Sequence, residues 1–248
     1  MNKSLVALTF TLTVIIGLPS MANAADYKVV DVTNGGSITG KVKFSGKDPD
    51  PKIFTITKDN DTCGTGDRKI DYVRVSNGAL NDTVVYLKKI KSGKAFSVEL
   101  DKPEIDQKKC DFTPFLSVMK NKDKLMVHNS DPVLHNIHTY ELIGKAKKTV
   151  FNISQPPELK TINKAVKLKR GTSMKLECDA HDFMHGYVFV AKNPYFSVVK
   201  DDGSFTIDNV PPGKYNIIAW HGFLGEKKGK VTVAAGSAAN IDFTFKGK

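Results

Sequence analysis

The sequence predicts an all-β fold, and three observations lead to this prediction. Apolar and polar residues alternate in short runs, as half-buried strands do, for example over residues 38–44 and 204–207. Turn-forming pairs such as Asp202-Gly203 separate these runs. Long, capped 3.6-residue periodicity is absent, and the best helical candidate is one short segment near residues 156–164.

Residues 1–24 resemble a secretory signal peptide. Lys3 supplies a positive charge, residues 5–18 are apolar, and Ala22 and Ala24 form an A-x-A cleavage pattern. We therefore expect cleavage after Ala24 and a periplasmic or secreted protein, with no transmembrane segment in the mature chain. The apolar run is short for a span of ~20 residues, and an uncleaved anchor is the alternative.

The three cysteines divide into a pair and a single thiol. An exported protein can keep disulfides, and an odd number of cysteines leaves one unpaired. Cys178 has histidine and methionine neighbours, so by elimination Cys63 and Cys110 form the disulfide. Two alternatives stay open, namely that both are reduced and buried, or that they serve a second metal site.

The most informative motif is C-x2-H-x2-M, formed by Cys178, His181 and Met184, with His135 lying 43 residues upstream. One thiolate, two imidazoles and one thioether are the ligands of a blue-copper site, in which the methionine is a weak axial ligand. Each residue also has a simpler interpretation, as a buried thiol, a surface histidine or a core methionine.

The surrounding pattern resembles the cupredoxins, with the compact Cys-to-Met loop of the amicyanin type. Residues 116–131 indicate strand, turn and strand, a further strand ends at Cys178, and residues 186–190 form the last strand. The resemblance implies a Greek-key β-sandwich, placed at residues 61–195. It also implies one copper ion on His135, Cys178, His181 and Met184.

Other residues of this region receive roles from the same resemblance. Asn136 is expected to form hydrogen bonds across to the cysteine loop, and Phe183 to contribute to an apolar docking patch. His138 and His185 are candidates for an additional metal site. Since His138 lies an odd number of residues from His135, a regular strand would point the two side chains to opposite faces.

The C-terminal part has a pattern of its own. Residues 202–215 (DGSFTIDNVPPGKY) resemble the signature of carboxypeptidase-regulatory-like domains, which are small transthyretin-like β-sandwiches. We assign residues 196–248 to such a domain. Residues 36–46 resemble the first strand of the same family, so the N-terminal β segment 25–60 either completes a split domain or forms a separate unit.

These features predict a mononuclear copper protein of the cupredoxin type that transfers single electrons and is not an enzyme. The formal net charge of +11 favours an acidic redox partner, for example a c-type cytochrome or a dehydrogenase. Scattered lysines without a basic-aromatic patch argue against nucleic acid. The alternatives are copper delivery or storage without redox turnover, and a small-molecule redox reaction at an open copper position; zinc would suit part of the ligand set.

Overall fold

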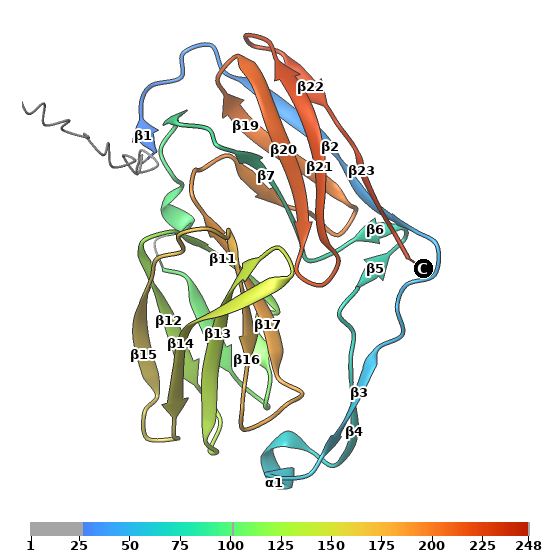
Figure 1. Ribbon diagram of the computed structural model, residues 1–248, viewed down its shortest axis with the longest axis vertical. Coiled ribbons are helices and arrows are strands. Elements are labelled where there is room, and N and C mark those ends of the chain that lie inside the picture. Colours follow the sequence, from blue (N-terminus) through green and yellow to red (C-terminus); the bar gives the residue numbers. More distant parts are fainter. Residues whose placement is uncertain (1–26, 101, 248) are drawn as a thin grey trace, which may run out of the picture.

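The computed structural model describes residues 27–100 and 102–247 (Figure 1). The predicted signal peptide lies outside the described residues. The all-β prediction is confirmed, since the described chain folds almost entirely into strands arranged as two stacked units. No helix among the described residues is long and apolar enough to cross a membrane.

The lower sandwich consists of two sheets that face each other across one apolar core. Its five-stranded sheet contains, in spatial order, β11 (Leu116–Lys120), β17 (His185–Ala191), β16 (Ser173–Glu177), β13 (His135–Ile143) and β14 (Ala146–Gln155). Its four-stranded sheet contains β10 (Phe112–Thr113), β9 (Glu104–Gln107), β12 (Asp123–Asn129) and β15 (Thr161–Val166).

The upper sandwich is built around a second core. One sheet contains β18 (Phe196–Val198), β7 (Thr83–Lys88), β20 (Gly213–His221) and β21 (Gly225–Val233). The other contains β19 (Ser204–Val210), β2 (Gly36–Ser45), β6 (Ala79–Leu80), β5 (Val75–Ser76), β22 (Ala238–Asn240) and β23 (Phe243–Lys246).

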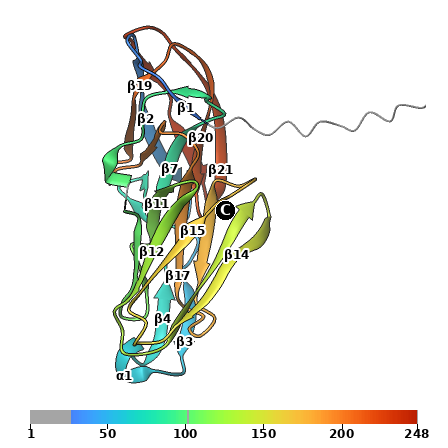
Figure 2. The ribbon, with the colours of Figure 1, turned by 90° about the vertical axis from the view of Figure 1, so that its left-hand side faces the viewer.

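The remaining elements are short. β1 (Lys28–Val29) pairs with β8 (Ser92–Gly93), and Val98–Leu100 form one turn of 3₁₀ helix. β3 (Lys52–Ile56) and β4 (Gly66–Ile70) pair with each other and enclose the four-residue helix α1 (Asn60–Cys63). This hairpin, residues 52–70, leaves the upper sandwich and runs down to the far end of the lower one (Figures 1 and 2).

β17 joins the two sandwiches because both of its faces are buried. Val188 and Val190 belong to the lower core, whereas Tyr187 and Phe189 belong to the upper one. Alternate side chains of a strand point to opposite faces, so an apolar residue at every position lets one strand serve two cores.

Strand pairing groups the chain differently from the predicted ranges. β6 and β7 lie within 61–195, but β6 pairs with β2, and β7 pairs with β18 and β20 of the C-terminal region. β2, within 25–60, pairs with β19, β22 and β23. Local alternation identifies a strand, but which sheet it joins depends on distant partners, so the ranges 25–60, 61–195 and 196–248 stay predictions.

Candidate metal centre

The candidate centre lies at the lower end of the lower sandwich, where the loop between β16 and β17 meets the start of β13. The loop carries Cys178, His181 and Met184, and β13 begins at His135. One donor atom each from His135, Cys178 and His181 lie within 4.8 Å of one another. Met184 is fully buried in the same apolar cluster, and its N–H donates to the His181 carbonyl at 3.0 Å.

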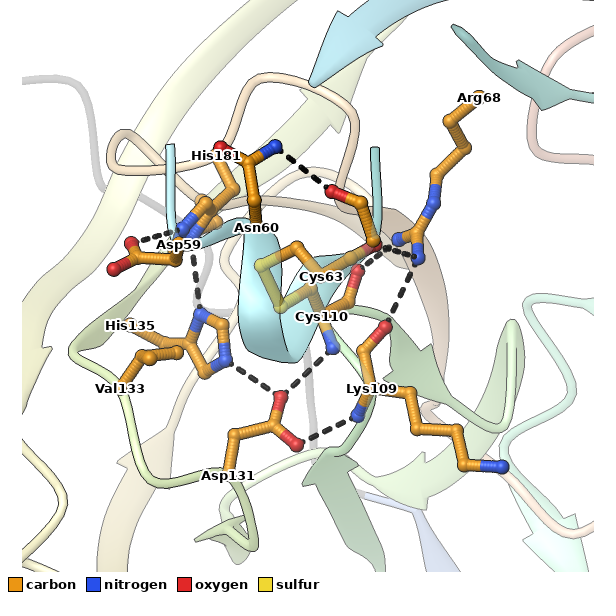
Figure 3. Close-up of a disulfide and its surroundings, with 12 residues drawn as sticks. Asp59, Asn60, Cys63, Arg68, Lys109, Cys110, Asp131, Val133, His135 and His181 are labelled. Atoms are coloured by element: carbon orange, nitrogen blue, oxygen red, sulfur yellow. Dashed lines mark hydrogen bonds and ion pairs between the residues drawn. A yellow bond between two sulfur atoms is a disulfide. The ribbon is translucent and has the colours of Figure 1, made fainter. Parts of the chain in front are cut away.

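Each histidine of the centre forms a hydrogen bond to a carboxylate through its Nε2 atom (Figure 3). The distance from His135 Nε2 to Asp131 Oδ2 is 2.8 Å, and that from His181 Nε2 to Asp59 Oδ2 is also 2.8 Å. A carboxylate only accepts hydrogen bonds, so a neutral imidazole in this position carries its proton on Nε2. Both Nδ1 atoms are then unprotonated.

These two Nδ1 atoms face each other at 3.1 Å. Burial lowers the pKa of His181, and this outweighs the opposite effect of Asp59, so the neutral ring is favoured. Two nitrogen lone pairs at this distance repel unless a proton or a cation lies between them. The arrangement therefore fits a cation held by both rings.

The Asp131 carboxylate accepts hydrogen bonds from three neighbouring groups. Burial alone would raise the pKa of its carboxyl group, but hydrogen bonds from the Cys110 N–H, the His135 ring and the Lys109 N–H keep the pKa below its ordinary value. The carboxylate therefore stays ionised and can orient the His135 ring.

The third donor, Cys178, is 2% exposed. Its Sγ accepts the Asn136 N–H at 3.4 Å and lies 3.8 Å from His181 Nδ1. Burial raises the pKa of the thiol despite hydrogen bonds from neighbouring backbone N–H groups. A metal ion would therefore bind here by displacing the thiol proton.

Asn136 connects β13 to the cysteine loop. Its Oδ1 accepts the Ala180 N–H at 3.1 Å, and its Nδ2 donates to Asp179 Oδ2 at 3.1 Å and to Asn152 Oδ1 at 2.7 Å. These bonds fix the position of the loop relative to His135.

The structure does not bring the two additional histidines into the group of donors. His138 bonds to Asp179 Oδ1 at 3.0 Å and stacks on Tyr140. The His185 ring lies 5.5 Å from Phe54 and 5.3 Å from Tyr72, measured between ring centroids, and neither ring nitrogen forms a well-formed hydrogen bond.

The prediction of an exposed docking patch at Phe183 does not hold. Its side chain is 2% exposed within the lower core, and the guanidinium group of Arg68 lies 4.7 Å from the ring centroid. Arg68 belongs to the hairpin 52–70, whose return to this end of the molecule has no local sequence signal.

The hairpin is fastened next to the centre by a disulfide between Cys63 and Cys110 (Figure 3). Arg68 adds hydrogen bonds to the carbonyl groups of Cys110 and Lys109, the second at 3.1 Å. Sequence reasoning missed both carboxylates. Asp131 could have been found from its position four residues before His135, whereas Asp59 lies 122 residues before His181.

Comparison with known proteins gives partial likenesses. A family model described as polysaccharide lyase family 4, domain II, matches residues 171–241. No curated protein matches the sequence. The predicted carboxypeptidase-regulatory-like domain at 196–248 stays a prediction.

Cupredoxins are among the similar solved structures, each over about a third of this chain. A reduced Cu(I) form of an amicyanin variant has a TM-score of 0.30 and 20% identity, covering 36% of this chain and 82% of that one. Amicyanin from Paracoccus versutus has a TM-score of 0.30 and 16% identity, covering 37% and 82%. A purple cupredoxin from Nitrosopumilus maritimus has a TM-score of 0.30 and 16% identity, covering 36% and 98%. Likenesses at this level say nothing of the activity of this chain.

The donor set itself limits the choice of metal. Two imidazole nitrogens and one thiolate would suit zinc as well as copper. The buried Met184 on the same loop as Cys178 and His181 favours copper, because soft sulfur donors stabilise Cu(I). The residues of the centre therefore fit a single copper ion.

Proposed function

We propose that this chain is a mononuclear copper protein in which His135, Cys178 and His181 hold the ion and Met184 is the weak fourth ligand. One observation carries the proposal: the two Nδ1 atoms face each other at 3.1 Å beside the buried Cys178 thiol, while each ring is fixed on a carboxylate through its other nitrogen. Bound copper would supply a one-electron couple.

The surrounding residues suit one-electron transfer because they resist movement. Asp131 and Asp59 hold the two imidazole rings, and the Asn136 N–H points at the thiolate sulfur. Fixed ligands keep the geometry similar in both oxidation states, which makes electron exchange fast. In this proposal the protein is a periplasmic carrier for an acidic redox partner and turns over no substrate.

A second candidate function is copper storage or delivery without redox turnover. The observation that favours it is the complete burial of the His181 side chain beneath the hairpin. A covered ligand slows exchange of the ion and removes the exposed histidine edge at which a redox partner could dock.

The test is to add Cu(II) to the purified protein lacking residues 1–24 and to record visible and EPR spectra. We expect an intense thiolate-to-copper band that is absent in Cys178→Ser. A spectrum that is indifferent to this substitution contradicts the copper proposal. Reversible cycling of the band by an oxidant and a reductant would support electron transfer, whereas tight binding of Cu(I) without cycling would support storage or delivery.

A further inference from the structure

The hairpin 52–70 covers the centre but has little structural support of its own. β3 and β4 form a separate two-stranded sheet, which is marginally stable in isolation. The hairpin is held instead by its contacts with the lower sandwich. Ile56 and Cys63 are buried in the lower core, and Phe54 packs against His185. Its position therefore depends on docking and on the disulfide.

The disulfide connects the two carboxylate anchors of the histidines (Figure 3). On one side, the Cys63 N–H donates to the Asp59 carbonyl at 2.8 Å, and the Asp59 carboxylate holds His181. On the other side, the Cys110 N–H donates to Asp131 Oδ2 at 2.8 Å, and the same oxygen accepts His135 Nε2–H. Both imidazole rings are thus linked to one sulfur–sulfur bond.

Closure of the hairpin also buries the centre. The side chain of His181 is fully buried, although Asp59, which contacts it, is 38% exposed. Within the hairpin, Asp59 contacts His181, and Arg68 contacts the ring of Phe183. If the hairpin moved away, the Nε2 side of His181, which now contacts Asp59, would meet solvent.

We propose that the hairpin 52–70 is a redox-controlled cover of the metal centre, in which Asp59 positions His181 and the Cys63–Cys110 disulfide keeps the cover closed. The inference rests on the proposed copper site and adds its regulation. A dithiol reductant transfers two electrons and two protons to the disulfide. The sulfur–sulfur bond breaks, Cys63 and Cys110 become thiols, and the reductant becomes a disulfide.

Without the bond, local opening of the hairpin becomes more frequent because its tether to Cys110 is lost. Asp59 then leaves His181, and metal can enter or leave. The freed Cys110 thiol stays near the centre, since its sulfur lies within 4.8 Å of donor atoms of Asp131 and His135. Reduction therefore adds the Cys110 thiol, a second soft metal donor, close to Asp131 and His135.

The first experiment needs no metal. Cys178 is the one free thiol of the chain, both in the oxidised protein and in a Cys63→Ser/Cys110→Ser variant. Its reaction rate with an aromatic disulfide reagent therefore reports opening of the cover. We expect the rate to rise on the order of tenfold or more in the double variant, because the disulfide no longer restricts opening of the hairpin. Equal rates would overturn the proposal.

Asp59→Gly tests the positioning role with the disulfide intact. Asp59 has φ 52°, a conformation that glycine adopts easily, so the substitution removes the carboxylate without backbone strain. We expect Cys178 to react several-fold faster. Asp67→Asn is the matched control, since Asp67 lies on the same hairpin and bonds to Thr55 away from the centre. If the control and Asp59→Gly react alike, Asp59 does not position His181.

The second experiment follows transfer of Cu(I) from the loaded protein to bicinchoninate, before and after treatment with a dithiol. We expect transfer to accelerate on the order of tenfold after reduction and in the double variant, but not in Asp67→Asn. A missing thiolate–copper band in the wild type would reject the copper site. The reaction rate of Cys178 would still test whether the hairpin covers the centre. A normal band with equal thiol and transfer rates rejects the cover alone. If the double variant does not fold, Asp59→Gly and its control decide.

Discussion

Asp131 and His135 lie four residues apart, and Oδ2 of Asp131 accepts the Nε2–H of His135 at 2.8 Å. The same oxygen accepts the backbone N–H of Cys110. One carboxylate therefore orients a candidate ligand and fixes the residue that carries the disulfide.

Asp131→Asn should weaken copper binding by about 10- to 100-fold, the usual effect of losing a group that orients a metal ligand. The amide can donate to His135 Nε2 and so favours the tautomer with its proton on Nδ1, the atom proposed to bind copper. The measurement is a competition titration with a Cu(I) chelator. Asp201→Asn, in an exposed turn of the upper sandwich, is the control. Equal affinities of the two variants would show that Asp131 has no role at the centre.

Met184→Leu tests whether Met184 is a copper ligand or only a core residue. Leucine keeps an apolar side chain of similar volume, so the free energy of unfolding of the metal-free protein should fall by less than ~1.5 kcal/mol. If Met184 is the axial ligand, the thiolate-to-copper band and the reduction potential shift clearly. Spectra and potential identical to those of the wild type would assign Met184 to the core alone. The measurements are urea unfolding, visible spectroscopy and voltammetry.

His185→Phe should stabilise the metal-free protein. The His185 ring lies against Phe54 and Tyr72, and its nitrogens have no well-formed hydrogen bond, only a weak interaction with the Asp182 backbone. An unsatisfied buried polar group costs about 1–3 kcal/mol, and phenylalanine removes this cost within an aromatic cluster. Urea unfolding at neutral pH provides the measurement. A lower midpoint would mean that the ring has a polar partner in solution.

His221 should make stability depend on pH. Its ring is 1% exposed in the upper core, and burial lowers its pKa from 6.5 to about 4. The folded state therefore disfavours the charged ring. The stabilisation is complete above the unfolded pKa of 6.5 and is lost as pH falls towards the folded value of about 4.

The matched variant for this effect is His221→Asn. Nδ1 of His221 accepts the N–H groups of Phe223 and Leu224, both at 3.2 Å, and an asparagine oxygen can accept similar bonds without titrating. We expect the stability lost between neutral pH and pH ~5 to be smaller by about 2 kcal/mol in the variant, as two-state linkage requires. Urea unfolding at both pH values measures it, and parallel pH profiles would contradict the assignment.

The strands could be predicted from the sequence because the relevant signal is local. Alternation over residues 38–44 becomes β2, whose buried and exposed residues alternate along most of its length. The C-x2-H-x2-M spacing is local too, since a short loop leaves Cys178 and His181 few ways to separate. Pairing of Cys63 with Cys110 followed from counting cysteines and assigning the third elsewhere.

Only the tertiary structure decided how the centre is covered and anchored. Asp59 and His181 are 122 residues apart, and nothing in either local pattern refers to the other. Phe183 has the apolar character of a docking residue, but the fold buries it in the lower core and brings Arg68 against its ring. Local alternation and spacing depend on backbone geometry, which the sequence reveals directly. Contacts between distant segments depend on how whole sheets pack, so the cover and the second histidine anchor emerge only once the chain is folded.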